Sequence, residues 1–208
     1  MTEEELLIER DQYLANGVHI GTRSTHVDMD EYIFRVKKNQ LAVLNLDKTD
    51  QQIREAAEML SDYEPDTVLT VGRKEEARMA LESFEEATGF NVKIGRFMPG
   101  TLTNPRSDGF MEPDAVIVTD PEQDSQVITE AAQTNIPVVA IADSGDRLDD
   151  IDIAIPANNK SQNSLGLVYF LIARELADIN GEEFELDLDD FRPEPEEEEV
   201  EEDEEDEE

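Results

Sequence analysis

The sequence contains no cysteine, which excludes disulfide bonds and thiolate metal sites. Its two histidines, His19 and His26, are seven positions apart across a glycine-containing segment, and without further ligands they make a poor metal pair. The longest apolar run, residues 165–173, has nine residues, too few to span a bilayer. The first residues are acidic, whereas a secretory signal begins with basic residues. We therefore expect a cytoplasmic protein with no membrane partner, no metal and no cofactor.

Basic residues are also scarce. The chain has 17 Lys and Arg residues against 53 Asp and Glu, a formal net charge of −36, and only six of the bases are lysine. An acidic surface with little lysine is typical of proteins from a cytosol at molar salt, where the Debye length falls to about 3 Å and self-repulsion is screened. The alternative is an acidic protein of an ordinary cytosol.

Much of the acid lies at the C-terminus. Residues 181–208 contain 19 acidic residues and one base, Arg192. Such a segment repels itself and buries nothing, so we expect one compact domain over residues 1–180 and a disordered acidic tail over 181–208. The tail would keep the protein soluble or contact basic neighbours. Without the tail, the domain still has a net charge of −18, with 34 acids and 16 bases.

Against this background, four long stretches contain no acid at all. They are residues 12–27, 32–46, 87–107 and 153–174, and together they carry nine bases. Buried strands and helices exclude charge anyway, which accounts for part of each stretch. Residues 95–106 instead have the composition of a loop, rich in Gly, Pro, Thr and Asn. A loop without acid on so acidic a chain suggests a surface kept clear for a polyanion.

Strand and helix patterns alternate along the chain. The clearest helix, 49–62, starts with a capping box at Thr49 and repeats apolar residues at helical spacing from Ile53. Thr2 should cap the first helix, and Asp120 should cap a helix with Pro121 at its first position. The expected helices are 2–16, 49–62, 73–88, 121–135 and 161–180, and the expected extended segments are 18–21, 32–36, 41–44, 67–71, 91–94, 115–119, 138–142 and 151–155.

The central strands are apolar on both faces, which indicates a parallel sheet covered by helices on both sides. We therefore expect an α/β fold: a flavodoxin-like, doubly wound, mainly parallel sheet preceded by an N-terminal helix and a hairpin. Right-handed crossovers would place the C-terminal ends of the strands, and their loops, at one edge.

Several ordered segments resemble one family. GVHIGT at 17–22, YIFRV at 32–36 and KTD at 48–50 resemble the N-terminal signature of the small-subunit ribosomal protein two family. The match is to its archaeal and eukaryotic branch, which includes the laminin-receptor precursor. GRFMPGTLTNP at 95–105 is the most specific segment, and 112–121, 136–140 and 155–161 continue the match. The resemblance covers roughly residues 5–178. The bacterial branch inserts a helical hairpin after its first strand, for which residues 21–32 leave no room.

The resemblance implies a structural component of the small ribosomal subunit with no catalytic role and no small-molecule substrate. Family members lie on the solvent side near the head–body junction and the messenger exit. They contact ribosomal RNA and neighbouring small-subunit proteins and support subunit assembly and translation. Segments 72–78 and 143–147 depart from the family pattern, so no binding role is transferred to them.

Within the acid-free stretches, cations and neutral donors are the residues that RNA binding requires. Arginine suits phosphate well because its planar fork binds two oxygens at once. For loop 95–106, the alternative is packing on its own domain; for the hairpin bases, it is solubility or edge protection; for 158–163, it is helix capping. The candidate RNA-binding residues are Arg23, Arg35, Lys37, Lys38, Arg96, Thr101, Thr103, Asn104, Arg106, Asn159 and Lys160.

Two other classes of function remain open. Asp47, Asp120 and Asp143 follow strands and could mimic the acidic pocket of a phosphorylated receiver domain. A small-molecule-binding α/β module would instead hold its ligand at the C-terminal ends of the strands. Segment 72–74 has a single glycine, so it lacks the spacing of a phosphate-binding loop, and no catalytic constellation stands out.

Overall fold

The computed structural model describes residues 6–193. Its centre is a parallel five-stranded sheet in the order β4-β3-β5-β6-β7. Counted along the chain from β3, this is the order 2-1-3-4-5 of the flavodoxin-like fold, which confirms the predicted fold class. The strands are β3 (Val68–Gly72), β4 (Asn91–Ile94), β5 (Ala115–Val118), β6 (Val138–Ala142) and β7 (Ile153–Pro156).

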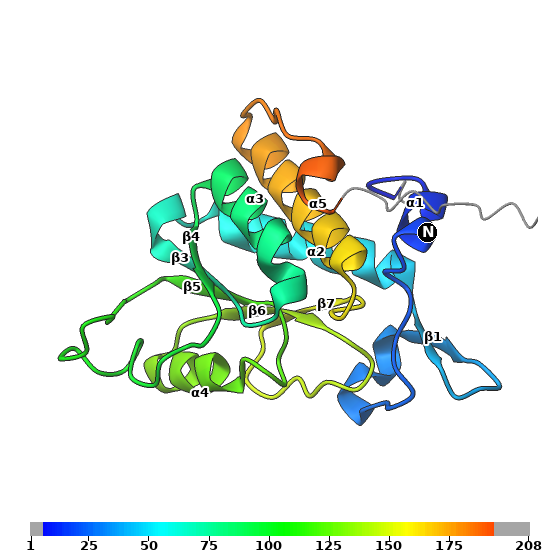
Figure 1. The fold of residues 1–208 in the computed structure, drawn as a ribbon, viewed down its shortest axis with the longest axis horizontal. Helices are drawn as coiled ribbons and strands as arrows, with labels where there is room; N and C mark the ends of the chain where they lie inside the picture. The colour runs from blue at the N-terminus through cyan, green and yellow to red at the C-terminus, as the bar shows by residue number, and fades with distance from the viewer. Residues whose placement is uncertain (1–5, 194–208) are drawn as a thin grey trace, which may run out of the picture.

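Helices cover both faces of the sheet (Figure 1). One face packs against α2 (Leu46–Ser61), α3 (Arg78–Thr88) and α5 (Gln162–Asn180), whose apolar sides form the larger core. The other face packs against α4 (Ser125–Thr134) and the buried side chains of Phe97 and Leu102. Side chains of β3, β5 and β6 are buried on both faces, and these strands are apolar apart from Thr70 in β3.

A small antiparallel sheet stands beside this core. It consists of β1 (Ile33–Val36) and β2 (Ala42–Leu44), close to the predicted hairpin. Ile20 adds an isolated bridge to Val43. The chain reaches the hairpin through α1 (Arg10–Ala15) and a 3-10 helix, Val27–Tyr32. Further single 3-10 turns are Pro65–Thr67, Glu75–Ala77 and Leu188–Asp190.

The N-terminal helix is much shorter than predicted. It begins at Arg10, and Thr2, its predicted cap, lies outside the described residues. The backbone of Leu7 explains the late start because its polar groups bond to distant side chains. Leu7 N–H donates to Asp50 Oδ1 at 2.7 Å, and Leu7 C=O accepts from Arg174 at 2.9 Å. These tertiary bonds replace the helical ones, and Leu6, Leu7 and Ile8 pack on the larger core.

Three predicted helix starts are also wrong. The α3 helix begins at Arg78, five residues later than predicted. The α2 helix begins earlier because Asn45, rather than Thr49, accepts a hydrogen bond from the N–H of Asp47 at 3.1 Å. The fourth helix begins at Ser125, later than Pro121. Asp120 still accepts from the N–H groups of Glu122 and Gln123, at 2.9 and 3.0 Å, so it caps a turn that precedes the helix.

Part of the predicted tail folds back on the domain. After α5 ends at Gly181, which has a left-handed φ of 70°, the side chain of Phe191 is buried against Phe170. Gly166 permits this approach because a Cβ there would lie 2.5 Å from the carbonyl oxygen of Phe191. The prediction that this segment buries nothing is therefore wrong for residues 184–191. Residues 194–208 of the predicted tail lie outside the described residues. Within residues 6–193, no helix has the length and hydrophobicity required to cross a membrane.

Candidate nucleic-acid interface

The β1–β2 hairpin presents three of the predicted cations, Arg35 on β1 and Lys37 and Lys38 at its tip. Arg35, Lys37 and Lys38 are exposed, and no ion pair joins any of them to a carboxylate within the described chain. The turn itself is well defined: Lys37 N–H donates to Leu41 C=O at 2.8 Å, and Gln40 N–H donates to Lys37 C=O at 2.9 Å. The hairpin therefore holds Lys37 and Lys38 on an ordered turn, next to Arg35 on β1.

The segment between β4 and β5, residues 95–114, is called the β4–β5 loop from here on. One carboxylate holds it. Glu130, on α4, accepts from Gly100 N–H at 2.7 Å, from Leu102 N–H at 2.9 Å and from the Thr103 hydroxyl at 3.2 Å. Burial alone would raise the pKa of Glu130, but these bonds and one from Gln126 hold that pKa below its ordinary value. The loop is thus tied to the domain by an acid that lies outside it.

This anchored loop has a buried side and an exposed side. Phe97 and Leu102 are buried, as the packing alternative predicted, and Lys93 lies over the Phe97 ring at 5.3 Å. Four predicted contact residues are exposed, and its two arginines form no ion pair among the described residues. Packing and presentation of polar groups therefore coexist in the loop. The exposed four are Arg96, Thr103, Asn104 and Arg106.

Two predicted contact residues are buried, so their predicted role in RNA binding is wrong. Thr101 has no exposed surface, and its hydroxyl donates to Met98 C=O at 2.6 Å. Asn159 is equally buried, and its amide donates to Ile141 C=O at 3.3 Å and to Asp146 at 2.9 Å. Both side chains stabilise the protein's own loops, so neither is available to RNA in this structure.

The last two predicted cations differ from each other. Arg23 is exposed in a segment fixed to the end of β6, where Thr22 N–H donates to the Ser144 hydroxyl at 2.9 Å. Lys160 is paired with Asp143 at 3.3 Å. Arg23 therefore remains free for a ligand, whereas a phosphate would have to compete with a carboxylate for Lys160.

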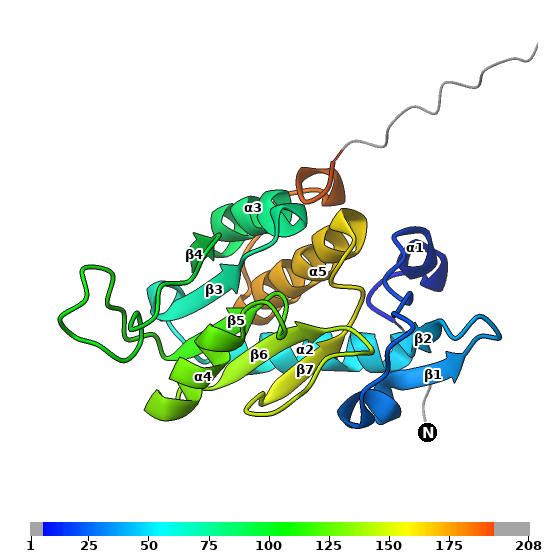
Figure 2. The ribbon, with the colours of Figure 1, turned by 60° about the horizontal axis from the view of Figure 1, so that its bottom comes forward.

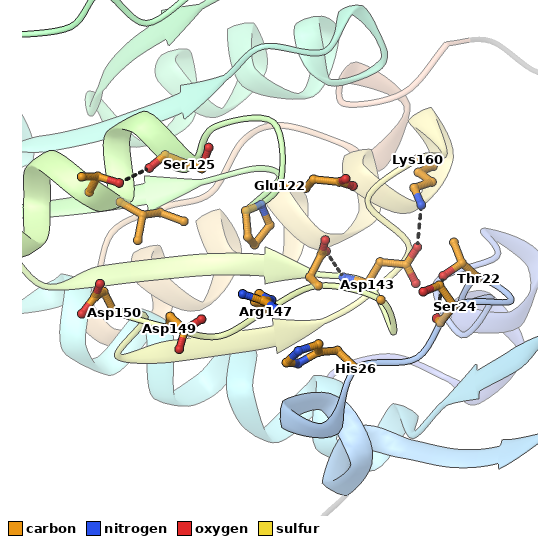
Figure 3. A pocket seen from close by; sticks show the side chains of 15 residues that line it. Thr22, Ser24, His26, Glu122, Ser125, Asp143, Arg147, Asp149, Asp150 and Lys160 are labelled. Atoms are coloured by element: carbon orange, nitrogen blue, oxygen red, sulfur yellow. Dashed lines mark hydrogen bonds and ion pairs between the residues drawn. The ribbon is translucent and has the colours of Figure 1, made fainter.

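A cleft of about 630 Å³ opens at the C-terminal edge of the sheet, where an α/β ligand site is expected (Figure 3). Its charged lining is mainly acidic, so it is a poor phosphate site. Asp120, beside it, already pairs with Lys74, while Asp47 on α2 pairs with Arg10 on α1. Within residues 6–193, no three acidic or histidine side chains are placed to hold a metal ion. This arrangement gives no support to a receiver-like site. The charged lining is His26, Glu122, Asp143, Asp146, Arg147, Asp149, Asp150 and Lys160.

Comparison with known proteins decides between these alternatives. The family model for ribosomal protein S2 matches residues 13–108 and 108–178. The chain belongs to the ribosomal protein S2 family. One relative, "Small ribosomal subunit protein uS2" of Haloquadratum walsbyi, is 42% identical over 192 residues, which cover 92% of this chain and 69% of the relative. As a member of the S2 family, the protein is a structural component of the small ribosomal subunit and is not an enzyme.

The S2 fold keeps the two basic loops far apart. Figure 2 shows the β1–β2 hairpin at one end of the long axis and the β4–β5 loop, in green, at the other, and Figure 1 agrees. The sheet lies between them. The sequence suggested one kind of surface in several segments, but the structure places these segments at separate positions on the molecule.

Three features of this S2 protein were not predicted from its sequence. Glu130 resembles any surface glutamate in a helix, and its role depends on a loop about 30 positions away. Lys74 and Asp120 form a buried ion pair between two strand ends. Phe34 is 67% exposed, although alternation within YIFRV gave some sign that one of its apolar residues would face outward.

Asp124 gives a testable pH dependence. Burial raises the pKa of Asp124 to about 7, and the neighbouring Asp120 carboxylate contributes to the rise. Because the folded value exceeds the ordinary 3.8, the folded protein keeps a proton that the unfolded chain releases, and stability from this group is lost as pH rises from 3.8 to about 7. Asp124→Asn should therefore raise the unfolding free energy above pH 7 by about 2–4 kcal/mol. Thermal unfolding of both proteins across pH 5–8 in molar KCl would measure this, and a constant difference between them would contradict it.

Proposed function

We propose that the protein binds small-subunit ribosomal RNA through two separate contacts, the hairpin tip and the exposed side of the β4–β5 loop, with Arg23 as a third point. Neighbouring small-subunit proteins would contact the acidic remainder of its surface. In this position, on the solvent side near the head–body junction, the protein would support assembly of the cytoplasmic ribosome and translation.

The unpaired cations carry this proposal. The acid-free stretches contain nine bases. Three of them serve the protein itself: Lys93 over Phe97, Lys160 with Asp143, and Arg174 with Leu7. The other six have no carboxylate partner within residues 6–193, on a chain where acids outnumber bases threefold. Chance pairing would neutralise some of them, so their isolation favours an external anion. The six are Arg23, Arg35, Lys37, Lys38, Arg96 and Arg106.

Net charge opposes RNA binding in dilute buffer, so the proposal includes a high-salt cytosol. At molar salt, repulsion is screened beyond about 3 Å, and release of counterions contributes little. Affinity must then come from local fit, in which charge-assisted hydrogen bonds act at contact distance. The anchored β4–β5 loop and the ordered hairpin turn favour this mode because little conformational entropy is lost on docking.

The proposal is tested by removing cations in matched pairs. Lys37→Gln/Lys38→Gln and Arg96→Gln/Arg106→Gln should each weaken binding to an in vitro transcript of the small-subunit ribosomal RNA by about tenfold or more, measured by filter binding in molar KCl. Arg78→Gln/Arg147→Gln removes the same charge elsewhere and should change affinity less than about twofold.

Sedimentation of a high-salt lysate gives a second readout. The unmodified protein should migrate with small subunits, and a variant with both pairs of contact cations removed should shift toward the top of the gradient. The proposal would be contradicted if the two contact variants and the control variant bound the RNA with equal affinity. Full incorporation into subunits of the variant that carries all four contact substitutions would also contradict it.

A further inference from the structure

The hairpin carries an exposed aromatic ring among its cations. The phenylalanine of β1, Phe34, is 67% exposed, whereas every other phenylalanine of the chain is buried or partly buried. Val36 on the same strand is 55% exposed. Burial of apolar surface stabilises a protein by about 25 cal/mol per Å², and an exposed phenyl ring does not contribute this free energy. Its position beside Arg35 and Lys37 therefore calls for an occupant that combines an apolar face with negative charge.

A β-bulge places the ring and a cation at the same hollow. In β1, Ile33 pairs with Leu44 and Arg35 with Val43, so Phe34 is the extra residue of an irregular register. Consecutive residues of a regular strand point to opposite faces, and a bulge re-aims one of them. As a result, Phe34 and Arg35 both line one cavity of about 230 Å³.

This cavity, called the hairpin cavity from here on, is free of acid. Apart from Asn45 and His19, its lining is apolar or cationic, and it contains no Asp or Glu, although the chain has 53 of them. The His19 ring forms part of the wall, and burial together with the charge of Lys37 lowers the pKa of that ring, which favours its neutral form. The cavity therefore offers aromatic and aliphatic surfaces beside positive charge. The lining residues that the argument uses are Leu14, His19, Phe34, Arg35 and Lys37.

We propose that the hairpin cavity binds an unpaired nucleobase of the ribosomal RNA, stacked on Phe34, with the flanking phosphate beside Arg35 and Lys37. The inference rests on the proposed RNA-binding function and identifies what one of its contacts recognises. Sequence-tolerant stacking of bases on aromatic rings is a general mode of RNA recognition. Stacking also needs no long-range attraction, so it survives at molar salt, where charge alone contributes little.

An exposed apolar surface often marks a protein contact instead. The cationic lining and the absence of acid favour a nucleotide, because a nucleotide supplies an aromatic face and an anion together. A protein contact is therefore treated as an outcome of the test that would overturn the proposal.

The test uses the full chain in molar KCl with the small-subunit ribosomal RNA transcript as probe. Phe34→Leu keeps an apolar side chain but removes the ring, and it should weaken RNA binding by about tenfold, the loss expected for one stacked base. Phe34→Trp keeps an aromatic ring at this position, and its RNA affinity should be within about twofold of that of the unmodified protein.

Phe34→Trp is also a local reporter because the chain has no tryptophan. Its emission should be quenched on addition of RNA. Ile179→Trp, placed at a residue that is 49% exposed on α5, is the matched control and should not respond.

The outcomes separate this proposal from the broader one. If RNA affinity depends on Lys37 and Lys38 but not on Phe34, and the F34W emission is unchanged by RNA, the cavity does not hold a base while the proposed function stands. If RNA-free proteins of the small subunit alter the F34W emission and RNA does not, the hairpin is a protein contact and this proposal is wrong. If the unmodified protein binds no RNA at all, both proposals fail.

Discussion

Transfer of the protein from molar KCl to dilute buffer should unfold it. The formal net charge is −36, and several ion pairs of the described chain are local surface pairs such as Arg78–Glu75 and Arg192–Asp189. Exposed pairs of this kind contribute little to stability, so they do not offset the repulsion among the remaining carboxylates. Lowering the salt lengthens the Debye length from about 3 Å at 1 M to about 30 Å at 0.01 M, and this repulsion then acts across the domain.

Circular dichroism during a KCl titration measures this, and refolding on return of the salt shows that the loss is reversible. The variant Glu58→Gln/Glu85→Gln/Glu86→Gln, which removes exposed acids from α2 and α3, should need less salt to stay folded. A domain that remains fully folded and binds RNA in dilute buffer would show that its composition is not an adaptation to salt.

Replacing Glu130 by glutamine should release the β4–β5 loop. The carboxylate accepts hydrogen bonds from two backbone amides and a hydroxyl, at Gly100, Leu102 and Thr103. An amide cannot accept all of them, and it leaves a buried donor unpaired. We expect a loss of about 2–4 kcal/mol in unfolding free energy. RNA affinity should also fall, because a loose loop must be ordered on binding.

Amide hydrogen exchange at Gly100 and Leu102 is the direct readout. Both amides should be protected in the unmodified protein and exchange rapidly in the E130Q variant, while Glu122→Gln on the same side of the sheet leaves them protected. Because the folded pKa of Glu130 lies below its ordinary 4.5, its contribution is complete above that pH and is lost as the pH falls through the lower folded value. Slow exchange in the E130Q variant would show that the loop is held by other contacts.

Local patterns were sufficient for most of the fold. The strands 91–94 and 138–142 were predicted with the bounds that the structure has, because short β-branched runs between turn residues leave few alternatives. Gly181 marked the end of α5, since only a residue tolerant of positive φ fits there. The parallel direction of the strands was predictable because the central strands are largely apolar on both faces.

Features fixed by distant partners were not predictable. The start of α1 depends on Leu7 bonding to Asp50, and the docking of Phe191 depends on the absence of a side chain at Gly166. The periodicity of apolar residues along the sequence carries no information about such long-range contacts. The candidate contact residues were found by composition, and composition cannot distinguish the buried Thr101 from the exposed Thr103 two positions later. That difference depends on which way the loop faces α4.

The separation of the two basic loops has a consequence for when the protein can join a subunit. A stiff sheet holds the hairpin and the β4–β5 loop at a fixed span, so under the proposed RNA binding both can be occupied only if two RNA segments already stand that distance apart. An immature RNA with one segment misplaced would engage a single end and dissociate readily. The protein would then remain bound only to RNA in which folding has already brought the two segments to the correct separation.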